Sequence, residues 1–254
     1  MFKRIAVFLY GVASYVAFLA TFLYAIGFIG NFGVPASMDG APVMSSGKAL
    51  IVDLLLLGMF ALQHSLMARP FFKRWLTRFI PESAERSTYV LLSSLALIAL
   101  FVFWQPLGGV VWDVQDPAAR GVLYGFFAFG WLLVLVSTFL INHFDLFGLR
   151  QVWLQLLGQP YTALRFGTPG PYRLVRHPLY LGWLFCFWAT PTMTGTHLLF
   201  TFLTTAYIFV AIQFEERDLV DSLGEDYRRY RERVPMILPL RRPTPDGRRA
   251  NLQV

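Results

Sequence analysis

A segment in the C-terminal third of the chain gathers side chains that could bind a charged small molecule. Residues 170–182 read Gly-Pro-Tyr-Arg-Leu-Val-Arg-His-Pro-Leu-Tyr-Leu-Gly, so that His177 stands directly before Pro178. Proline is favoured at the first position of a helix because no N–H is needed there, and a helix is therefore predicted to begin at Pro178. A helix N-terminus offers free N–H groups and positive potential. We expect His177 and this helix end to hold a carboxylate.

Two neighbouring glutamates, Glu215 and Glu216, follow a long apolar run. A carboxylate near membrane depth is costly unless it is paired or functional. An amino-acid head group would provide a partner, because its ammonium can meet Glu215 while its carboxylate meets His177. Glu216 and Arg217 are expected to form a surface ion pair, which contributes little to stability. The pattern indicates a ligand with a methionine-like head group.

The composition indicates a membrane setting for these residues. Of the 254 residues, 56% are hydrophobic and 15% are charged, whereas soluble domains usually carry about 25% charged residues. Apolar blocks at 5–29, 49–68, 88–107 and 121–142 each provide the roughly 20 residues of one transmembrane helix. A fifth block, 179–213, is too long for one crossing and is interrupted by a Pro-Thr-Met-Thr-Gly-Thr turn. We expect an all-α, polytopic membrane helical bundle of four single spans, a C-terminal helical hairpin and cytoplasmic cap helices.

Basic residues indicate how the chain crosses the lipid bilayer. The formal net charge is +7, and the segment 69–86 is rich in Lys and Arg, whereas the loops 30–48 and 108–120 hold few cations. Short positive loops stay in the cytoplasm, so the segments 69–86 and 143–178 and both termini are predicted to be cytoplasmic. The expected location is a bacterial inner membrane. The fold signatures of nucleic-acid readers do not accompany these cations, and no nucleic-acid partner is expected.

The chain is expected to comprise three parts. The first is a four-span bundle at 1–142, and the second, at 143–240, contains a connector, the hairpin and a ligand-binding cap. Within the second part, the segment 224–230 is interpreted either as part of the cap or as an amphipathic interfacial helix. The third part is a basic tail at 241–254, which is predicted to be disordered or surface-bound.

Three residues inside the apolar blocks have expected structural roles. Cys186, the single cysteine, permits no intrachain disulfide and no cysteine-based zinc cluster, and it is predicted to serve packing. His197 opens the second arm of the hairpin and is expected to lie at the membrane interface. Asp53 lies inside the second span, where a carboxylate is rare, and is expected to be buried with a partner.

The C-terminal motifs resemble the isoprenylcysteine carboxyl methyltransferase superfamily. The shared pattern is Arg-His-Pro-x-Tyr-x-Gly at 176–182, the Glu-Glu pair, Gly-x-x-Tyr-x-x-Tyr at 224–230 and a Val-Pro ending at 234–235. The resemblance implies a membrane methyltransferase that uses S-adenosylmethionine. It also implies a cofactor site formed by Leu164, Arg165, Phe166, Gly167, Tyr172, His177, Pro178, Leu179, Tyr180 and Glu215.

Two further motifs narrow the resemblance to the bacterial methanethiol S-methyltransferases, which release dimethyl sulfide. They are Gln-His-Ser-Leu-Met-Ala-Arg-Pro at 63–70 and Asn-His-Phe-Asp-Leu-Phe-Gly-Leu-Arg-Gln at 142–151. The prenylcysteine enzymes carry a substrate-binding arginine one helical turn before the glutamate that matches Glu215, whereas this chain has Ala211 there. The resemblance therefore implies a small thiol as the substrate rather than a prenylated carboxylate.

Methyl transfer to a thiol requires a base, because the thiolate is the nucleophile. His143 and Asp145, two residues apart, form the preferred pair, in which either side chain takes the proton or Asp145 orients His143. His64 is the second candidate. The residues expected to bind or orient the substrate are Asn142, Arg150 and Gln151.

Two other functions are compatible with the sequence. One is a methyltransferase on the same fold that acts on a lipid amine or another small acceptor. The other is a non-enzymatic protein that holds haem between its spans through His64 and His143, because bis-His ligation within a helical bundle is chemically reasonable. The long motif string from 164 to 240 favours the thiol methyltransferase.

Overall fold

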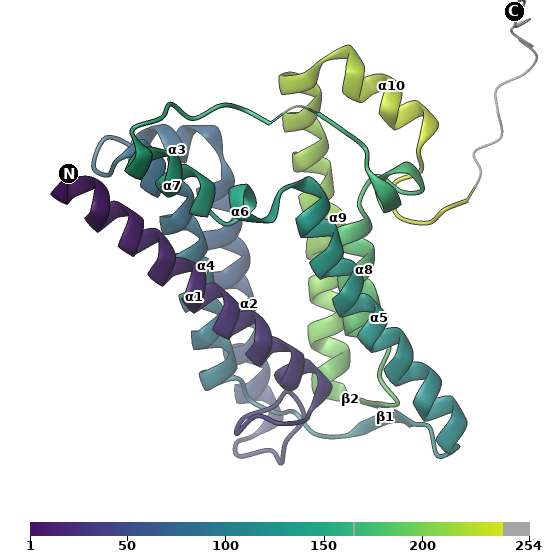
Figure 1. Cartoon of the computed structure of the whole chain (residues 1–254). Helices are drawn as coiled ribbons and strands as arrows, with labels where there is room; N and C mark the ends of the chain where they lie inside the picture. Colours follow the sequence, from purple (N-terminus) through teal and green to yellow (C-terminus); the bar gives the residue numbers. More distant parts are fainter. Residues whose placement is uncertain (165, 241–254) are drawn as a thin grey trace, which may run out of the picture.

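The computed structural model describes residues 1–164 and 166–240, so that Arg165 and the expected tail at 241–254 lie outside the described residues. Five of the described helices are long and apolar enough to cross a membrane. Each of the four expected single spans is present, and the expected all-α membrane bundle is confirmed (Figure 1). The five helices are α1 (Phe2–Gly30), α2 (Ser46–Ala68), α4 (Glu82–Phe103), α5 (Pro117–Ile141) and α9 (Gly195–Leu223).

The fifth apolar block forms a hairpin with unequal arms. Its first arm, α8 (Pro178–Trp188), begins at the proline, as the motif predicts. The 11 residues of α8 rise only about 16 Å, which is short of the roughly 30 Å hydrocarbon core. The turn contains the strand β2 (Thr192–Thr194), which pairs antiparallel with β1 (Val110–Asp113). No sequence pattern predicted this small sheet, because its strands are only four and three residues long.

Short helices gather at the end of the bundle that carries the N-terminus, which we call the cap end (Figure 1). The chain turns sharply at Asn142 and Gly148, whose φ angles of 93° and 87° lie in the left-handed region. The opposite end carries β1 and β2, and we call it the sheet end. The elements at the cap end are α3 (Pro70–Leu76), α6 (His143–Leu146), α7 (Leu149–Leu157), the 3-10 turn η1 (Gly170–Arg173) and α10 (Glu225–Arg233).

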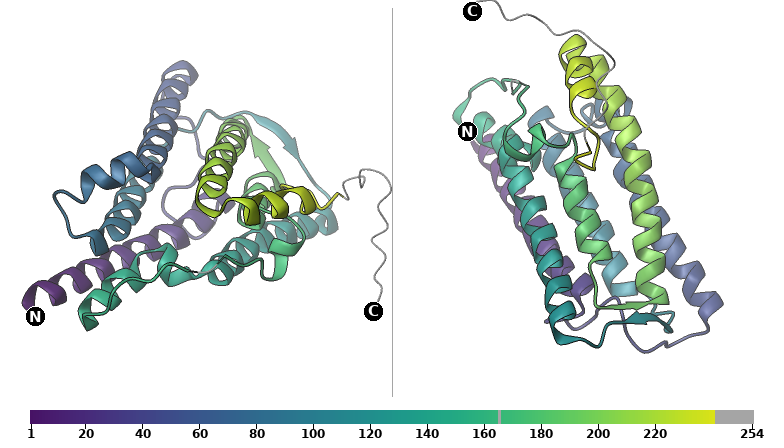
Figure 2. Two further views of the ribbon diagram at one scale, coloured as in Figure 1. Left: turned by 90° about the horizontal axis from the view of Figure 1, so that it is seen from above. Right: turned by 90° about the vertical axis from the view of Figure 1, so that its right-hand side faces the viewer.

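The long helices form two groups, seen from three sides in Figures 1 and 2. In one group α1 packs against α4 and α7, and α2 packs against α4; in the other, α5 packs along α8, and α8 contacts α9. The close approach of α5 and α8 depends on two glycines, because a Cβ at Gly130 or Gly182 would lie 2.8 Å from backbone atoms of the opposite helix. In Figure 1, α1 and α9 come together at the sheet end and lie far apart at the cap end.

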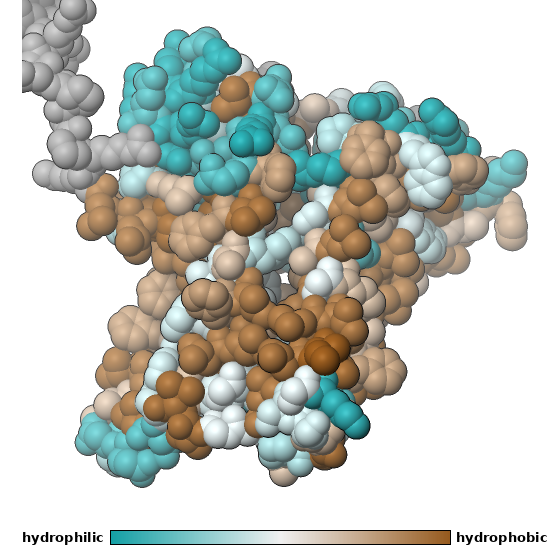
Figure 3. All heavy atoms as spheres, turned by 180° about the vertical axis from the view of Figure 1, so that it is seen from behind, coloured by the Kyte–Doolittle hydropathy of each residue, from teal (hydrophilic) through white to brown (hydrophobic). Residues whose placement is uncertain are grey.

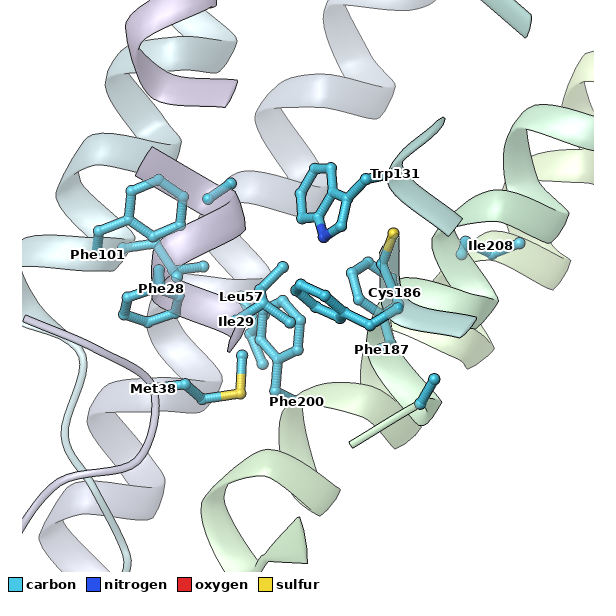
Figure 4. Close-up of a cluster of buried hydrophobic side chains, with 14 of the residues drawn as sticks. Phe28, Ile29, Met38, Leu57, Phe101, Trp131, Cys186, Phe187, Phe200 and Ile208 are labelled. Carbon is cyan, nitrogen blue, oxygen red and sulfur yellow. The ribbon is translucent and has the colours of Figure 1, made fainter. Parts of the chain in front are cut away.

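An apolar core joins the two groups toward the sheet end (Figure 4). Cys186 is buried within this core, which confirms that it serves packing. The close-up shows aromatic rings from both groups converging on a shared interior. Side chains that the two groups contribute include Phe28, Leu57, Phe101, Trp131, Phe187 and Phe200.

The outer surface carries a broad apolar band between two polar ends (Figure 3). Large exposed side chains such as Leu55, Phe126 and Val210 lie on the long helices. An exposed apolar surface of this extent is unfavourable in water and suits contact with lipid. The chain is therefore a multi-pass membrane protein that resides in a lipid bilayer.

Two polar residues near the sheet end, Asp53 and His197, are both buried. Asp53 is buried with a partner, as expected, because its Oδ1 accepts a hydrogen bond from the N–H of Gln105 (2.9 Å). His197, which is expected at the membrane interface, is buried at the start of α9 and only 1% exposed. Its ring nitrogens lie 3.0 Å from the carbonyl oxygen of Phe187 and 3.4 Å from Asp39 Oδ2. The loop that carries Asp39 covers the start of α9, which local sequence does not reveal.

Candidate active site

Glu215 and Glu216 are adjacent on α9 but have different neighbours, because consecutive helical residues point about 100° apart. Glu216 is 7% exposed, and its Oε1 accepts a hydrogen bond from Arg176 Nε (2.7 Å) and lies 3.1 Å from His177 Nε2. The expected surface pair of Glu216 and Arg217 is therefore wrong. Arg217 is exposed and lies over a neighbouring aromatic ring. Glu216 instead belongs to a buried cluster of charged groups.

Arg176, which was not among the expected site residues, fastens the C-terminal segment to the start of α8. Its Nη1 donates to the carbonyl oxygens of Arg231 (3.0 Å) and Val234 (2.6 Å), and its Nη2 lies 2.7 Å from Glu216 Oε1. The backbone N–H groups of Arg176 and the next residue donate to the carbonyl oxygens of residues 235–236. A buried guanidinium is tolerated when its donors are satisfied in this way. Its position directly before the His-Pro pair is the only feature of the sequence that pointed to this structural role of Arg176.

Glu215 is half-buried, and its hydrogen-bond partner among the described residues is a single hydroxyl. Tyr180 donates from its OH to Glu215 Oε2 (2.8 Å). Tyr172 lies within electrostatic range of the same carboxylate, and burial, followed by the charge of Glu215, raises the pKa of Tyr172 above its ordinary value. None of the salt bridges found within residues 1–164 and 166–240 involves Glu215. This carboxylate therefore has the capacity to accept the ammonium group of a ligand.

The start of α8 brings several of the expected cofactor residues together. His177 is buried and directs its Nε2 toward Glu216, and its ring centroid lies 5.6 Å from that of Tyr180. Pro178 and Leu179 complete the first turn of α8, where Pro178 is buried. His177 is thus placed beside the Tyr180 and Glu215 contact, although its Nε2 meets a carboxylate of the protein.

A cavity of about 390 Å³ lies beside the stretch 164–167, which belongs to the expected cofactor site. Phe166 contributes to its wall, with its ring centroid 5.7 Å from that of Tyr230 and 6.1 Å from that of Tyr227. Tyr227 is buried, and Tyr230 donates from its OH to the carbonyl oxygen of Tyr172 (2.6 Å), so α10 is part of the cap. Burial raises the pKa of Tyr230 to about 12. The expected stretch also includes the exposed Leu164 and Gly167 and, outside the described residues, Arg165.

His143 occupies an enclosed aromatic site between α1 and α5. Its Nε2 lies 2.8 Å from Tyr15 OH, and its Nδ1 lies 2.8 Å from Thr138 Oγ1. The ring stacks on Phe139 with the centroids 4.2 Å apart, and the residue is 4% exposed. Burial lowers the pKa of His143, so the imidazole is neutral near physiological pH.

Asp145 has partners other than the one expected. Asp145 Oδ1 accepts a hydrogen bond from Arg150 Nη1 (2.8 Å). Within the described part of the chain, Asp145 makes no hydrogen bond with His143. The other two residues expected at the substrate site bond to the same turn. Asn142 Oδ1 accepts from the N–H of Asp145 (3.1 Å), and Gln151 Nε2 donates to the carbonyl oxygen of Asp145 (3.0 Å). These polar residues shape the turn between α6 and α7, and the expectation that Asp145 orients His143 is wrong.

His64 lies on α2 among hydroxyl groups. The OH of Tyr89 is 2.8 Å from His64 Nε2, and the Oγ of Ser93 is 3.2 Å from His64 Nδ1. The next residue, Ser65, has its Oγ 3.0 Å from the OH of Tyr207 on α9. His64 therefore belongs to a polar group at the place where the two groups of helices meet again toward the cap end.

The cap end of this multi-span helical bundle thus combines a half-buried carboxylate with a largely polar cavity that Phe166 and Tyr230 border, which suits a charged cofactor with a flat base. The family model for phospholipid methyltransferase matches residues 122–226, which include α5, α8 and α9. The fold and this match define the class: the protein is an integral-membrane methyltransferase.

Curated relatives extend this similarity over nearly the whole chain. Methanethiol S-methyltransferase of Mycobacterium tuberculosis is 55% identical, with 93% of this chain and 97% of the relative aligned. The protein of the same name from Crocosphaera subtropica is 56% identical, with 93% of each chain aligned. Nurim of Sus scrofa is 32% identical over 76% of this chain and 78% of nurim. No solved structure shows a significant match.

The chain belongs to the family of the methanethiol S-methyltransferases. This membership confirms the resemblance drawn from the sequence motifs, and the relation to nurim agrees with the wider superfamily.

Proposed function

We propose that this protein transfers the methyl group of S-adenosylmethionine to methanethiol and thereby produces dimethyl sulfide. The names of relatives that match along more than nine-tenths of the chain support this acceptor. A small uncharged acceptor also agrees with Ala211, which stands one helical turn before Glu215 and offers no cation for a carboxylate substrate. The cap end faces the cytoplasm of a bacterial cell, with the bundle in the inner membrane and both termini on the cytoplasmic side.

The observation that carries the proposal is the half-buried carboxylate of Glu215, whose hydrogen-bond partner among the described residues is the Tyr180 hydroxyl. This carboxylate suits the ammonium of a methionine moiety. The rings of Phe166 and Tyr230 suit an adenine base, which binds aromatic side chains through its flat face. The residues present therefore fit S-adenosylmethionine, which would supply an electrophilic methyl group on a sulfonium sulfur.

The chain itself binds and orients the reactants in this scheme. Arg176 and Glu216 hold the segment 231–236 against the start of α8, so the cofactor residues have a fixed arrangement. The apolar band allows a small thiol to arrive through the bilayer, while a charged cofactor enters from water. Holding the two sulfur atoms in line with the methyl group, in a site with little water, lowers the barrier to transfer.

The proposal is tested by gas chromatography of the headspace above cells that express the protein and receive methanethiol. Wild-type cells should release dimethyl sulfide. A Glu215→Gln variant at matched expression should release about tenfold less or lower, because a charge-assisted hydrogen bond to the cofactor is lost. Glu225→Gln changes an exposed carboxylate of α10 and should match wild type. Wild-type cells that release no dimethyl sulfide above the empty-vector control would contradict the proposal.

A lipid amine is the second candidate acceptor, because the family model that matches residues 122–226 is that of phospholipid methyltransferase. Methyl-labelled S-adenosylmethionine distinguishes the two acceptors, since the label enters the lipid extract in one case and the headspace in the other. The geometry of His143 does not favour the haem alternative. Both of its ring nitrogens already contact hydroxyl groups and are not free for an axial bond to iron.

A further inference from the structure

A chain of polar side chains around His64 is not used by the cofactor site described above. Tyr89 and Ser93 of α4 place their hydroxyl groups 2.8 Å and 3.2 Å from the Nε2 and Nδ1 of His64. Gln63 Nε2 donates to the same Ser93 oxygen (3.4 Å). All four residues lie on two helices that are apolar enough to span a membrane. Polar groups at such positions are costly and are usually retained for function.

This polar group adjoins α9, which carries Glu215. Ser65 follows His64 and contacts Tyr207 of α9 at 3.0 Å. Just past the end of α2, Arg69 Nη1 lies 3.1 Å from Asp218 Oδ2, again on α9. The two contacts fix α9 beside α2 along the cap half of the bundle.

Tyr180 connects the polar group to the cofactor site. Its OH donates to Glu215 Oε2 (2.8 Å), and both Tyr89 and Tyr207 lie within its electrostatic range. Tyr207 precedes Glu215 by about two turns of α9. The hydroxyl groups of Tyr89 and Tyr207 therefore lie near the end of the cofactor site that is deepest in the bundle.

The hydrogen bonds around His64 can be satisfied by the tautomer that carries its proton on Nδ1. Gln63 donates to Ser93, whose oxygen can also accept the Nδ1–H of His64. This tautomer leaves a lone pair on Nε2, which accepts a hydrogen bond from the Tyr89 hydroxyl. The Tyr89 oxygen then has lone pairs that are able to accept a proton from a third group. Tyr89 and His64 thus form a short path for a proton.

The other histidine with a tyrosine partner has different surroundings. His143 pairs with Tyr15, but rings of Phe18, Phe139 and Phe147 enclose its imidazole, and it is 4% exposed. His64, by contrast, is only partly buried. The contacts of His143 with Tyr15 and Thr138 join α1 to α5, whereas His64 keeps part of its surface open to a reactant.

We propose that the acceptor thiol binds beside Tyr89, among these hydroxyl groups, and that Tyr89 passes the thiol proton to His64, with Ser93 as a positioning residue. The inference rests on the proposed thiol methylation. It names the acceptor site of that reaction and places it between α2, α4 and α9.

The thiol S–H bond breaks as its proton passes to the Tyr89 oxygen, while the Tyr89 hydroxyl proton passes to His64 Nε2. The thiol sulfur forms a bond to the methyl carbon of the sulfonium donor, and the old carbon–sulfur bond breaks with its electron pair left on the donor sulfur. The products are two neutral thioethers and a protonated imidazole, which later releases its proton to water.

The test compares purified Tyr89→Phe and His64→Gln with Tyr10→Phe. Tyr10→Phe is a matched control, because it removes a hydroxyl that donates to Thr88 between α1 and α4 (2.9 Å) and that is not among the hydrogen-bond partners of His64 in the described part of the chain. Folding is checked by thermal unfolding, and cofactor-site integrity by calorimetry with S-adenosylhomocysteine. Rates are measured with methanethiol and with an acidic aromatic thiol that is already ionised at mildly basic pH.

Both site variants should lose about 100-fold or more in kcat/KM for methanethiol and keep the affinity of wild type for S-adenosylhomocysteine. With the acidic thiol they should lose less than about tenfold, because no proton has to be removed. The pH profile for methanethiol should lose its acidic limb in His64→Gln. The titratable groups that face His64 are Arg86 and Tyr89 of α4, and the Tyr207 hydroxyl of α9 lies beyond Ser65. Arg86 is left unchanged in every variant, so that its charge acts equally in all pH profiles.

Normal methanethiol turnover by folded Tyr89→Phe would overturn the inference. So would a His143→Gln variant that loses methanethiol turnover and is rescued by the acidic thiol while His64→Gln behaves as wild type. If Tyr89→Phe does not fold, His64→Gln carries the same test. If wild-type protein binds S-adenosylhomocysteine but methylates neither thiol, both this inference and the proposed function fail. If wild type and both site variants methylate methanethiol equally well, only this inference fails.

Discussion

At the sheet end, helices of both groups share one apolar core, whereas at the cap end the same helices carry polar groups. Phe28, Trp131 and Phe200 belong to the core (Figure 4). The polar His197 has both ring nitrogens in contact with oxygen atoms of the protein. At the cap end, Glu215 and Tyr89 retain hydrogen-bonding capacity toward a ligand. The difference teaches that the sheet end is a closed apolar core, whereas the cap end, although it has a structural charge cluster of its own, keeps polar groups available for chemistry.

Arg176→Ala should lower the free energy of unfolding more than any of the other substitutions, because Arg176 belongs to the buried charge cluster that holds the cap end together. The change leaves Glu216 buried without its main cation, which costs about 3–5 kcal/mol. Thermal unfolding in detergent should show a large loss for Arg176→Ala and almost none for Arg228→Ala, which breaks an exposed pair with Glu225. Equal melting temperatures for the two variants would mean that the cluster does not hold the cap.

Glu215→Gln should separate binding from stability at the cap end. Loss of the charge should weaken S-adenosylhomocysteine binding by roughly 10–100-fold, because a charge-assisted contact contributes about 1.5–3 kcal/mol. The melting temperature without ligand should stay close to that of wild type, since the hydrogen bond to Tyr180 can be kept by an amide. Calorimetry measures the affinity, with Glu225→Gln as the control. Unchanged affinity in Glu215→Gln would remove this residue from the cofactor site.

The seam between α5 and α8 connects the two ends and depends on close backbone contact. Gly182→Ala should cost about 1–3 kcal/mol, because the new Cβ would lie 2.8 Å from the carbonyl oxygen of Gly130. Gly125→Ala is the matched control on α5, since a Cβ there meets no atom within 4 Å and helix propensity improves by up to about 1 kcal/mol. Opposite shifts of the two melting temperatures are expected. A higher melting temperature in Gly182→Ala would show that α5 and α8 are not in close backbone contact.

The smallest expected effect is a pH-dependent change in melting temperature that comes from the enclosed His143. Burial lowers its pKa from the ordinary 6.5, so below that pH the unfolded chain takes up a proton that the folded protein does not. The contribution to stability is complete above pH 6.5 and declines as the pH falls. Between about pH 7.5 and pH 5.5, wild type should lose roughly 2–4 °C more in melting temperature than His143→Gln. A parallel loss in both proteins would contradict the enclosed neutral state.

Hydrophobic patterning was sufficient to predict the spans, because each crossing needs a run of apolar residues whatever its neighbours are. The start of α8 at Pro178 was also predictable, since it depends on local backbone chemistry. Which of Glu215 and Glu216 faces the buried cluster was not, because a helix that is apolar on all sides does not reveal its rotation. The burial of His197 depends on a loop about 160 residues away in the chain, and local patterns do not record such contacts.

The spacing of Tyr89 and Ser93, four residues apart, shows that they share one face of α4. It does not show that the face meets His64, because helix pairing is a tertiary property. The same limit applied to Asp145, whose sequence neighbour His143 is not its partner in space.

The most direct test of the central claim uses purified protein in lipid nanodiscs with methyl-labelled S-adenosylmethionine and methanethiol. The account predicts that the label appears in dimethyl sulfide in the headspace, at a rate that falls about tenfold or more in Glu215→Gln. Label that stays entirely in the added S-adenosylmethionine, with wild-type protein that is folded by thermal unfolding, would contradict it.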